Sequence, residues 1–169
     1  GWRQRQVGRA ARGRFEVVLR GIPMGGPYEL ALSVGDESVV VRRLRVGDVW
    51  LIAGQSNAQG GGNLRTAPRS HPKVHAMFMD EHWDGAREPT HFLADSPDPV
   101  HYEACGKAPL SKTQRGRLYH AAVKGVGFGV FFGREMVRRS GGVPQGLLCT
   151  AHGGTSMEQW DPAKKKLGG

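Results

Sequence analysis

The sequence has 169 residues, of which 38% are hydrophobic, so it is long and apolar enough for one packed domain, and wholesale disorder is excluded. Its 26 glycines and 10 prolines indicate many loops and argue against a helical bundle. The net charge of +9 raises the possibility of a nucleic-acid partner. However, over half of the excess positive charge lies in residues 1–20, and more lies in Lys164, Lys165 and Lys166. Because basic runs near chain ends are typical of solvated tails, we predict no nucleic-acid partner.

Residues 1–14 form a basic arm by composition, without the apolar core of a signal peptide. A cleaved signal peptide stays open, because the sequence does not begin with Met. No apolar run approaches the length of a membrane span, so we predict no membrane partner.

Short antiparallel strands are predicted next. Short segments with alternating or continuous apolar side chains follow one another closely, at residues 15–19, 28–34 and 38–41. The composition of residues 22–27 predicts a turn. Three strands are few for a separate sandwich. We therefore interpret residues 15–47 as the end of a larger β domain.

The pattern then changes to that of an α/β fold. Residues 49–53 are apolar on both faces, which predicts a parallel strand covered by helices on each side, and residues 73–79 are a weaker strand candidate. Residues 80–117 contain four prolines and little periodicity, and we expect a long loop there.

A helix and a further buried strand complete this pattern. Residues 127–140 have helical spacing, which predicts a helix with Phe128, Phe131 and Phe132 toward the sheet. Residues 146–151 are again apolar. The order strand, loop, helix, strand favours an α/β domain with a parallel sheet.

The two strongest strand candidates both end in glycine-rich polar loops. The loops read Gly54-Gln55-Ser56-Asn57 and His152-Gly153-Gly154-Thr155. Because ligands of open α/β sheets bind beyond the carboxyl ends of the strands, both loops should face one crevice. Taken alone, the first loop is equally typical of a helix N-cap. It also resembles the nucleophile-elbow pattern G-x-S-x-G, with Ala58 in place of the last glycine. A phosphate loop is disfavoured, because no Lys-Ser/Thr follows the glycines.

Four motifs in order resemble the sialate O-acetylesterase and acetylxylan-esterase branch of the SGNH (GDSL-like) hydrolases. They are the segment GGPYELALSVGDESVVVRRLRVGDVW and the blocks GDVWLIAGQSN, GVGFGVFFGREM and HGGTSMEQWD. The resemblance covers roughly residues 15–162. It implies an SGNH-type, flavodoxin-like parallel sheet with flanking helices, incomplete in this chain, with residues 48–169 as the front part of the esterase domain.

The resemblance also implies roles for individual residues. Ser56 would be the nucleophile, and its backbone N–H and that of Gly127 would help to form the oxyanion hole. Gly153, Gly154 and Thr155 would line the site. His152 adjoins this loop, which favours a role in lining the acyl or sugar pocket over a role as the base. The third oxyanion donor stays open, with the side-chain amides of Gln55 and Asn57 as candidates.

The catalytic base that the resemblance implies has no counterpart here. This family carries a His in a D-x-x-H motif near the end of the catalytic domain, and no D-x-x-H follows the HGGT block in this sequence. We therefore expect the front part of a longer serine esterase that removes O-acetyl groups from sialic acid or another carbohydrate, with a second chain or a missing C-terminal part completing the site. An acetylxylan esterase and a non-catalytic carbohydrate-binding module are the alternatives.

Other features leave alternatives open. Serine chemistry of this kind requires no metal or cofactor, and the pair His71 and His75 lacks a third ligand. Trp160 is equally suited to stacking on a sugar ring and to core packing. Cys105 and Cys149 allow one disulfide or none. The resemblance implies a secreted or periplasmic location for the full enzyme, while that of this chain stays open.

Overall fold

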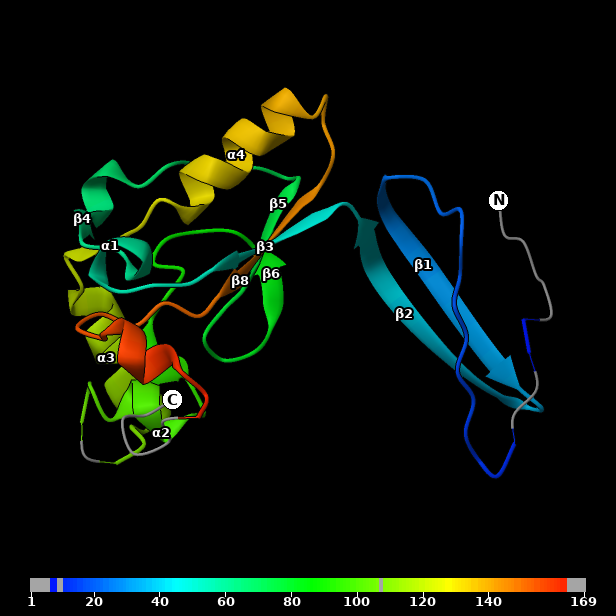
Figure 1. Ribbon diagram of the computed structural model, residues 1–169, viewed down its shortest axis with the longest axis horizontal. Coiled ribbons are helices and arrows are strands. Elements are labelled where there is room, and N and C mark those ends of the chain that lie inside the picture. The colour runs from blue at the N-terminus through cyan, green and yellow to red at the C-terminus, as the bar shows by residue number, and fades with distance from the viewer. Residues whose placement is uncertain (1–6, 9–10, 107, 164–169) are drawn as a thin grey trace. The chain divides into compact units, whose positions relative to one another are not determined.

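The computed structural model describes residues 7–8, 11–106 and 108–163, and it divides the chain into two compact units, Gly1–Val46 and Gly47–Gly169 (Figure 1). Most of the basic arm and the cluster at Lys164, Lys165 and Lys166 lie outside the described residues. In the part of the chain that is described, none of the helices is long and apolar enough to cross a membrane.

The first unit contains a β-hairpin. Strands β1 (Gly25–Val34) and β2 (Glu37–Val46) pair antiparallel around a turn at Gly35, whose φ of 59° suits glycine. Residues 15–19 form no strand, so the expected third strand is wrong; alternation alone forms no strand without a neighbouring backbone to pair with. The predicted turn at residues 22–27 is also too long, since β1 already begins at Gly25.

The second unit is built on a four-stranded sheet in the order β3-β8-β5-β6. Its three parallel strands are β3 (Asp48–Ile52), β8 (Gln145–Cys149) and β5 (Val74–Met77), and β6 (Trp83–Gly85) pairs antiparallel with β5. A small second ladder joins β4 (Gly62–Asn63) to β7 (Lys124–Val126). A sheet with parallel strands and flanking helices confirms the predicted α/β class.

The helices of this unit connect the strands. They are α1 (Ser56–Gln59), α2 (Pro99–Tyr102), α3 (Lys112–Ala121) and α4 (Gly129–Arg139), with 3-10 turns η1 (Leu64–Thr66), η2 (Leu93–Asp95) and η3 (Met157–Trp160). The expectation of one long loop over residues 80–117 is therefore wrong. Local caps start these helices: Asp98 accepts a hydrogen bond from the Val100 amide, and Ser111 forms a capping box with Gln114.

Helix α4 packs on β5 and β8 over the core (Figure 1). Its buried side contains Val130, Gly133 and Val137, and a Cβ at Gly133 would lie 2.7 Å from Val74 Cγ1. Phe132 meets Trp50 edge to face at 5.0 Å. The other two aromatics were predicted wrongly, since Phe128 and Phe131 are about half exposed. Small residues bring α4 close to the sheet, which leaves no room for three rings beneath it.

Only one face of β3 is buried. Ile52 is 3% exposed, whereas Val49 is 61% and Leu51 is 62% exposed. Because successive strand side chains point to opposite faces, the described residues cover one face of this strand and leave the other open. The prediction that helices cover both faces is therefore wrong for the described part of the chain.

Candidate active site

The two glycine-rich loops leave the same edge of the sheet. Strands β3 and β8 run parallel with Ile52 opposite Cys149, so both loops begin at neighbouring carboxyl ends. A backbone hydrogen bond of 2.9 Å from the His152 N–H to the Gly54 carbonyl joins them beyond the last paired residues. The fold thus brings the GQSN segment and the HGGT segment side by side.

Ser56 is the first residue of α1, and it is exposed. The residue before it, Gln55, occupies the N-cap position and makes no side-chain capping bond. Among the described residues, none forms a hydrogen bond with the Ser56 hydroxyl, so this hydroxyl is accessible from solvent. Gln55 and Asn57 are also exposed, so both side-chain amides are accessible beside Ser56.

Gly153 packs directly against the serine. A Cβ built on Gly153 would lie 3.6 Å from both Cα and Cβ of Ser56 and 2.8 Å from Gln59 Oε1. The Gly153 N–H donates to that Gln59 oxygen. Sequence reasoning missed Gln59, although its position one helical turn after Ser56 places it on the same side of α1. A Cβ at position 153 would thus be in ordinary contact with the serine but would overlap the Gln59 side-chain oxygen.

Gly127 is buried behind α1. A Cβ on Gly127 would lie 2.9 Å from the Ala58 carbonyl oxygen. Burial raises the pKa of Glu88, and the nearby Gly127 backbone N–H opposes this rise. The Gly127 amide therefore lies near a buried carboxyl.

Glu88 belongs to a buried polar group that sequence reasoning missed. Its Oε2 accepts from the Thr90 backbone N–H at 3.0 Å, and the Thr90 hydroxyl lies 3.0 Å from His91 Nδ1. Burial lowers the pKa of His91 to about 4, and the nearby Ile52 backbone opposes this shift. This group lies beside the end of β3, because His91 is near Ile52, which precedes the GQSN loop by two residues.

Replacement of His91 should change the acid stability of the protein. Between pH 6.5 and about 4, His91 is protonated in the unfolded chain but stays neutral in the native protein. The free energy of unfolding therefore falls as the pH falls through this range. We expect this loss to be smaller in His91→Gln by up to about 3 kcal/mol. Urea unfolding at pH 7 and pH 4 measures it, with exposed His120→Gln as the control; equal losses in wild type and His91→Gln would contradict the assignment.

A hollow of about 360 Å³ lies beside the second loop. It is lined by His101, His152, Gly153, Gly154, Thr155 and Trp160, among others. The two histidines meet with Nδ1 atoms 2.9 Å apart, so one ring donates the proton and the other accepts it. Burial lowers the pKa of both, and His152 lowers that of His101 further, which favours neutral rings near neutral pH. The hollow therefore offers polar, uncharged groups.

Trp160 lies at the edge of this hollow rather than in the core. Its side chain is 36% exposed, and its Nε1–H donates to Thr155 Oγ1 at 2.9 Å. That bond fixes the indole beside the HGGT segment and favours the surface alternative over core packing.

The remaining candidates are settled by burial and distance. Cys105 is exposed and Cys149 is buried, and both are free thiols, so they do not pair. Burial raises the pKa of Cys149 to about 12 and makes that thiol unreactive. Within residues 7–8, 11–106 and 108–163, no group of three or more His, Cys, Asp or Glu side chains is placed to hold a metal ion.

Comparison with known proteins gives a family. The model of the family described as carbohydrate esterase, sialic acid-specific acetylesterase matches residues 46–168. No curated protein matches the chain. Similar solved structures include a protein from Arabidopsis thaliana (TM-score 0.44, 18% identity, 72% of this chain and 48% of that one) and a carbohydrate acetylesterase from Xanthomonas citri (TM-score 0.46, 20% identity, 84% and 30%).

The chain thus spans about half the length of the first of these structures and about a third of the second. The family match covers the strand β3, the GQSN loop, helix α4 and the HGGT loop, which are the parts that build the candidate site. The chain belongs to the carbohydrate esterase family of sialic acid-specific acetylesterases.

Proposed function

We propose that this chain carries the nucleophile of an esterase that removes O-acetyl groups from a carbohydrate, and that Ser56 is that nucleophile. The observation that carries the proposal is the exposed Ser56 at the carboxyl edge of the sheet, packed against Gly153. The neighbouring hollow at His152 and Trp160 gives a sugar a polar surface and an aromatic ring.

The proposed reaction proceeds in two steps. Ser56 Oγ attacks the acetyl carbonyl, a base takes the serine proton, and the sugar hydroxyl leaves with a proton to give an acetyl-enzyme. Water then attacks the acetyl group and releases acetate, and Ser56 regains its proton. The backbone N–H of Ser56 is the first donor to the oxyanion.

Further oxyanion donors must exchange partners. The Gly153 amide donates to Gln59, and the Gly127 amide lies near the buried Glu88 carboxyl, so either would have to turn from its present neighbour to reach the substrate. The exposed amides of Gln55 and Asn57 have no such competitor among the described residues and are the better third donor.

The base is proposed to lie outside these 169 residues. The sequence has no D-x-x-H after the HGGT segment; its one such pattern, Asp98 to His101, lies before that segment. His101 and His152 both have a lowered pKa, and each has a ring nitrogen engaged by the other. A lowered pKa makes His152 a weaker base, and its position suits it to bind the sugar. A second chain or a further segment would supply the His and its carboxylate.

The 169-residue chain should accordingly be a poor catalyst by itself. Without a base, serine stays protonated, and loss of a triad base reduces turnover by a factor on the order of a million. We expect only weak acetate release from acetylated xylooligosaccharides, and a much higher rate from a polypeptide extended through a D-x-x-H segment. Strong turnover by the chain alone that His152→Ala abolishes would place the base at His152 instead.

The absence of a D-x-x-H after the HGGT segment also keeps a second candidate function, a carbohydrate-binding module without catalysis. The two are separated by the extended polypeptide: sugar binding with no Ser56-dependent acetate release would support the binding module. The identity of the sugar, sialic acid or a neutral polysaccharide such as xylan, depends on the surface beside the serine.

A further inference from the structure

A second hollow lies at the carboxyl end of β5. It has a volume of about 130 Å³ and is lined by the segment after β5, with Phe78, Asp80 and His82, and by Asp95 and Tyr119. Because β3, β8 and β5 run parallel, this hollow opens on the same edge of the sheet as Ser56. Strand β8 alone separates β5 from β3, so the two strands are about 10 Å apart.

The segment from residue 92 to residue 101 forms a wall common to both hollows. Phe92 and Asp95 line the hollow at β5, while Val100 and His101 line the hollow beside the HGGT loop. The 3-10 turn η2 and helix α2 also contact each other, which keeps this wall continuous. The two hollows are therefore neighbours along one edge.

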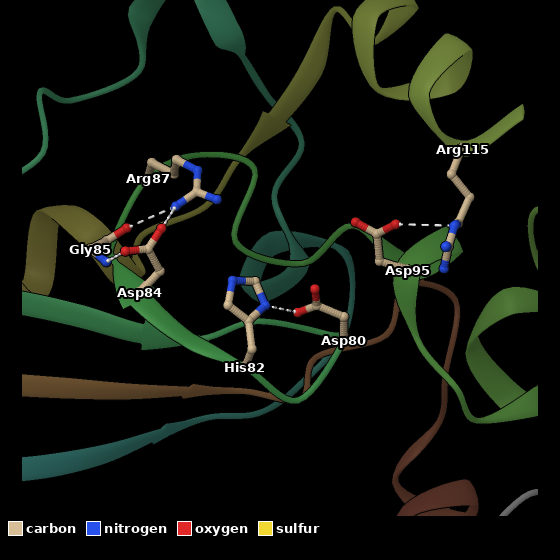
Figure 2. A network of polar contacts seen from close by, with 7 residues as sticks. All are labelled: Asp80, His82, Asp84, Gly85, Arg87, Asp95 and Arg115. Carbon is tan, nitrogen blue, oxygen red and sulfur yellow. Dashed lines mark hydrogen bonds and ion pairs between the residues drawn. The ribbon is translucent and has the colours of Figure 1, made fainter. Parts of the chain in front are cut away.

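The charges of the second hollow are already paired. Figure 2 shows Asp80 beside the His82 ring, Arg87 beside Asp84, and Arg115 beside Asp95. The Arg87–Asp84 distance is 2.7 Å and the Arg115–Asp95 distance is 3.7 Å. The one arginine that lines the hollow, Arg87, thus has a carboxylate partner and also lies over the Phe78 ring. An anionic group entering here would meet Asp80 and Asp95 with no unpaired cation among the described lining residues.

A neutral polyol meets a suitable surface there. The carboxylate oxygens of Asp80 and Asp95 accept hydrogen bonds from hydroxyl groups. Phe92 and Tyr119 meet edge to face at 5.3 Å, and Tyr119 is 37% exposed, so an aromatic wall is available to the C–H face of a ring. Hydroxyl donors and an apolar face are together the chemistry of an unmodified, uncharged sugar unit.

We infer that the hollow at Asp80, Asp95 and Tyr119 is a second carbohydrate subsite, which takes an uncharged sugar unit of the same chain whose acetylated unit lies at Ser56. The inference rests on the proposed function for the sugar at Ser56. It identifies the substrate as a neutral oligosaccharide spanning both hollows, rather than a lone sialic acid, whose carboxylate Asp80 and Asp95 would repel.

Titration of the 169-residue chain with xylotetraose, followed by amide NMR shifts, tests this subsite without any turnover. We expect shift changes at residues 78–82 and 92–95, at least tenfold weaker binding in Asp80→Ala and Tyr119→Ala, and wild-type affinity in the control Asp36→Ala, which alters an exposed aspartate in the hairpin turn. N-acetylneuraminic acid should produce no shifts at residues 78–82.

Asp80→Asn is the second variant, because it keeps the side-chain shape and leaves the fold intact even if Asp80→Ala does not. Shifts confined to the hollow at Trp160, unchanged affinity in both Asp80 variants, or preferential binding of N-acetylneuraminic acid would each overturn the subsite. Failure of the proposed function is a different result: xylotetraose would still bind at Asp80, while acetate release would not depend on Ser56.

Discussion

Replacement of Ser56 by alanine should reduce acetyl-ester hydrolysis by a factor on the order of 10⁴ to 10⁶ in a polypeptide that carries the complete site. Only a hydroxyl is removed, from an exposed position at which no described residue depends on it for a hydrogen bond. The fold should therefore be unchanged, and the loss should appear in kcat rather than in KM. Acetate release from acetylated xylooligosaccharides gives both constants.

Ser70→Ala is the matched control for this experiment, because Ser70 is also exposed but lies in the loop before β5. It should turn over like the wild type. Near wild-type kcat in Ser56→Ala would end the hydrolase proposal, provided that the far-ultraviolet spectra of the two variants agree.

Gly60→Ala should destabilise the protein by about 2–6 kcal/mol. Gly60 follows α1 with a φ of 120°, where a non-glycine residue costs about 1–3 kcal/mol. A Cβ there would also lie 2.4 Å from the Gly125 carbonyl oxygen and 2.9 Å from the Gly127 nitrogen. Relief of that overlap costs about 1–3 kcal/mol more and moves α1, with Ser56, away from Gly127.

Gly61→Ala provides the comparison within the same loop. No atom lies within 4 Å of a Cβ built at Gly61, so its substitution should change the free energy of unfolding by about 0.5 kcal/mol or less. Urea unfolding midpoints compare the two variants with the wild type. Equal midpoints for Gly60→Ala and Gly61→Ala would show that the contact with residues 125–127 does not fix the position of α1.

The apolar runs made the central strands predictable. Residues 49–53 and 146–151 are continuous hydrophobic stretches, and they lie over β3 and β8 with shifts of one or two residues at their ends. The glycine-rich loops that follow them could be located for the same reason. The uncovered face of β3 could not, because an apolar sequence shows which side chains avoid water without showing whether a neighbour covers them.

The helix α3 gave no periodic signal. None of its residues is buried, so its sequence has no apolar stripe, and only the Ser111–Gln114 capping box marked its start. Glu88 and His91 were missed for another reason: their burial depends on β3 and Gly127, which are far away along the chain. Local sequence contains no information on such contacts.

Trapping the acetyl-enzyme tests the central claim most directly. The polypeptide extended through a D-x-x-H segment is mixed with 4-nitrophenyl acetate, quenched in acid after short times, digested and analysed by mass spectrometry, with its Ser56→Ala variant treated in parallel. We predict one acetyl group on the peptide that contains Ser56, formed in the wild type and absent from the variant. An unmodified Ser56 peptide, together with acetate release that is the same in both proteins, would contradict the assignment of Ser56 as the nucleophile.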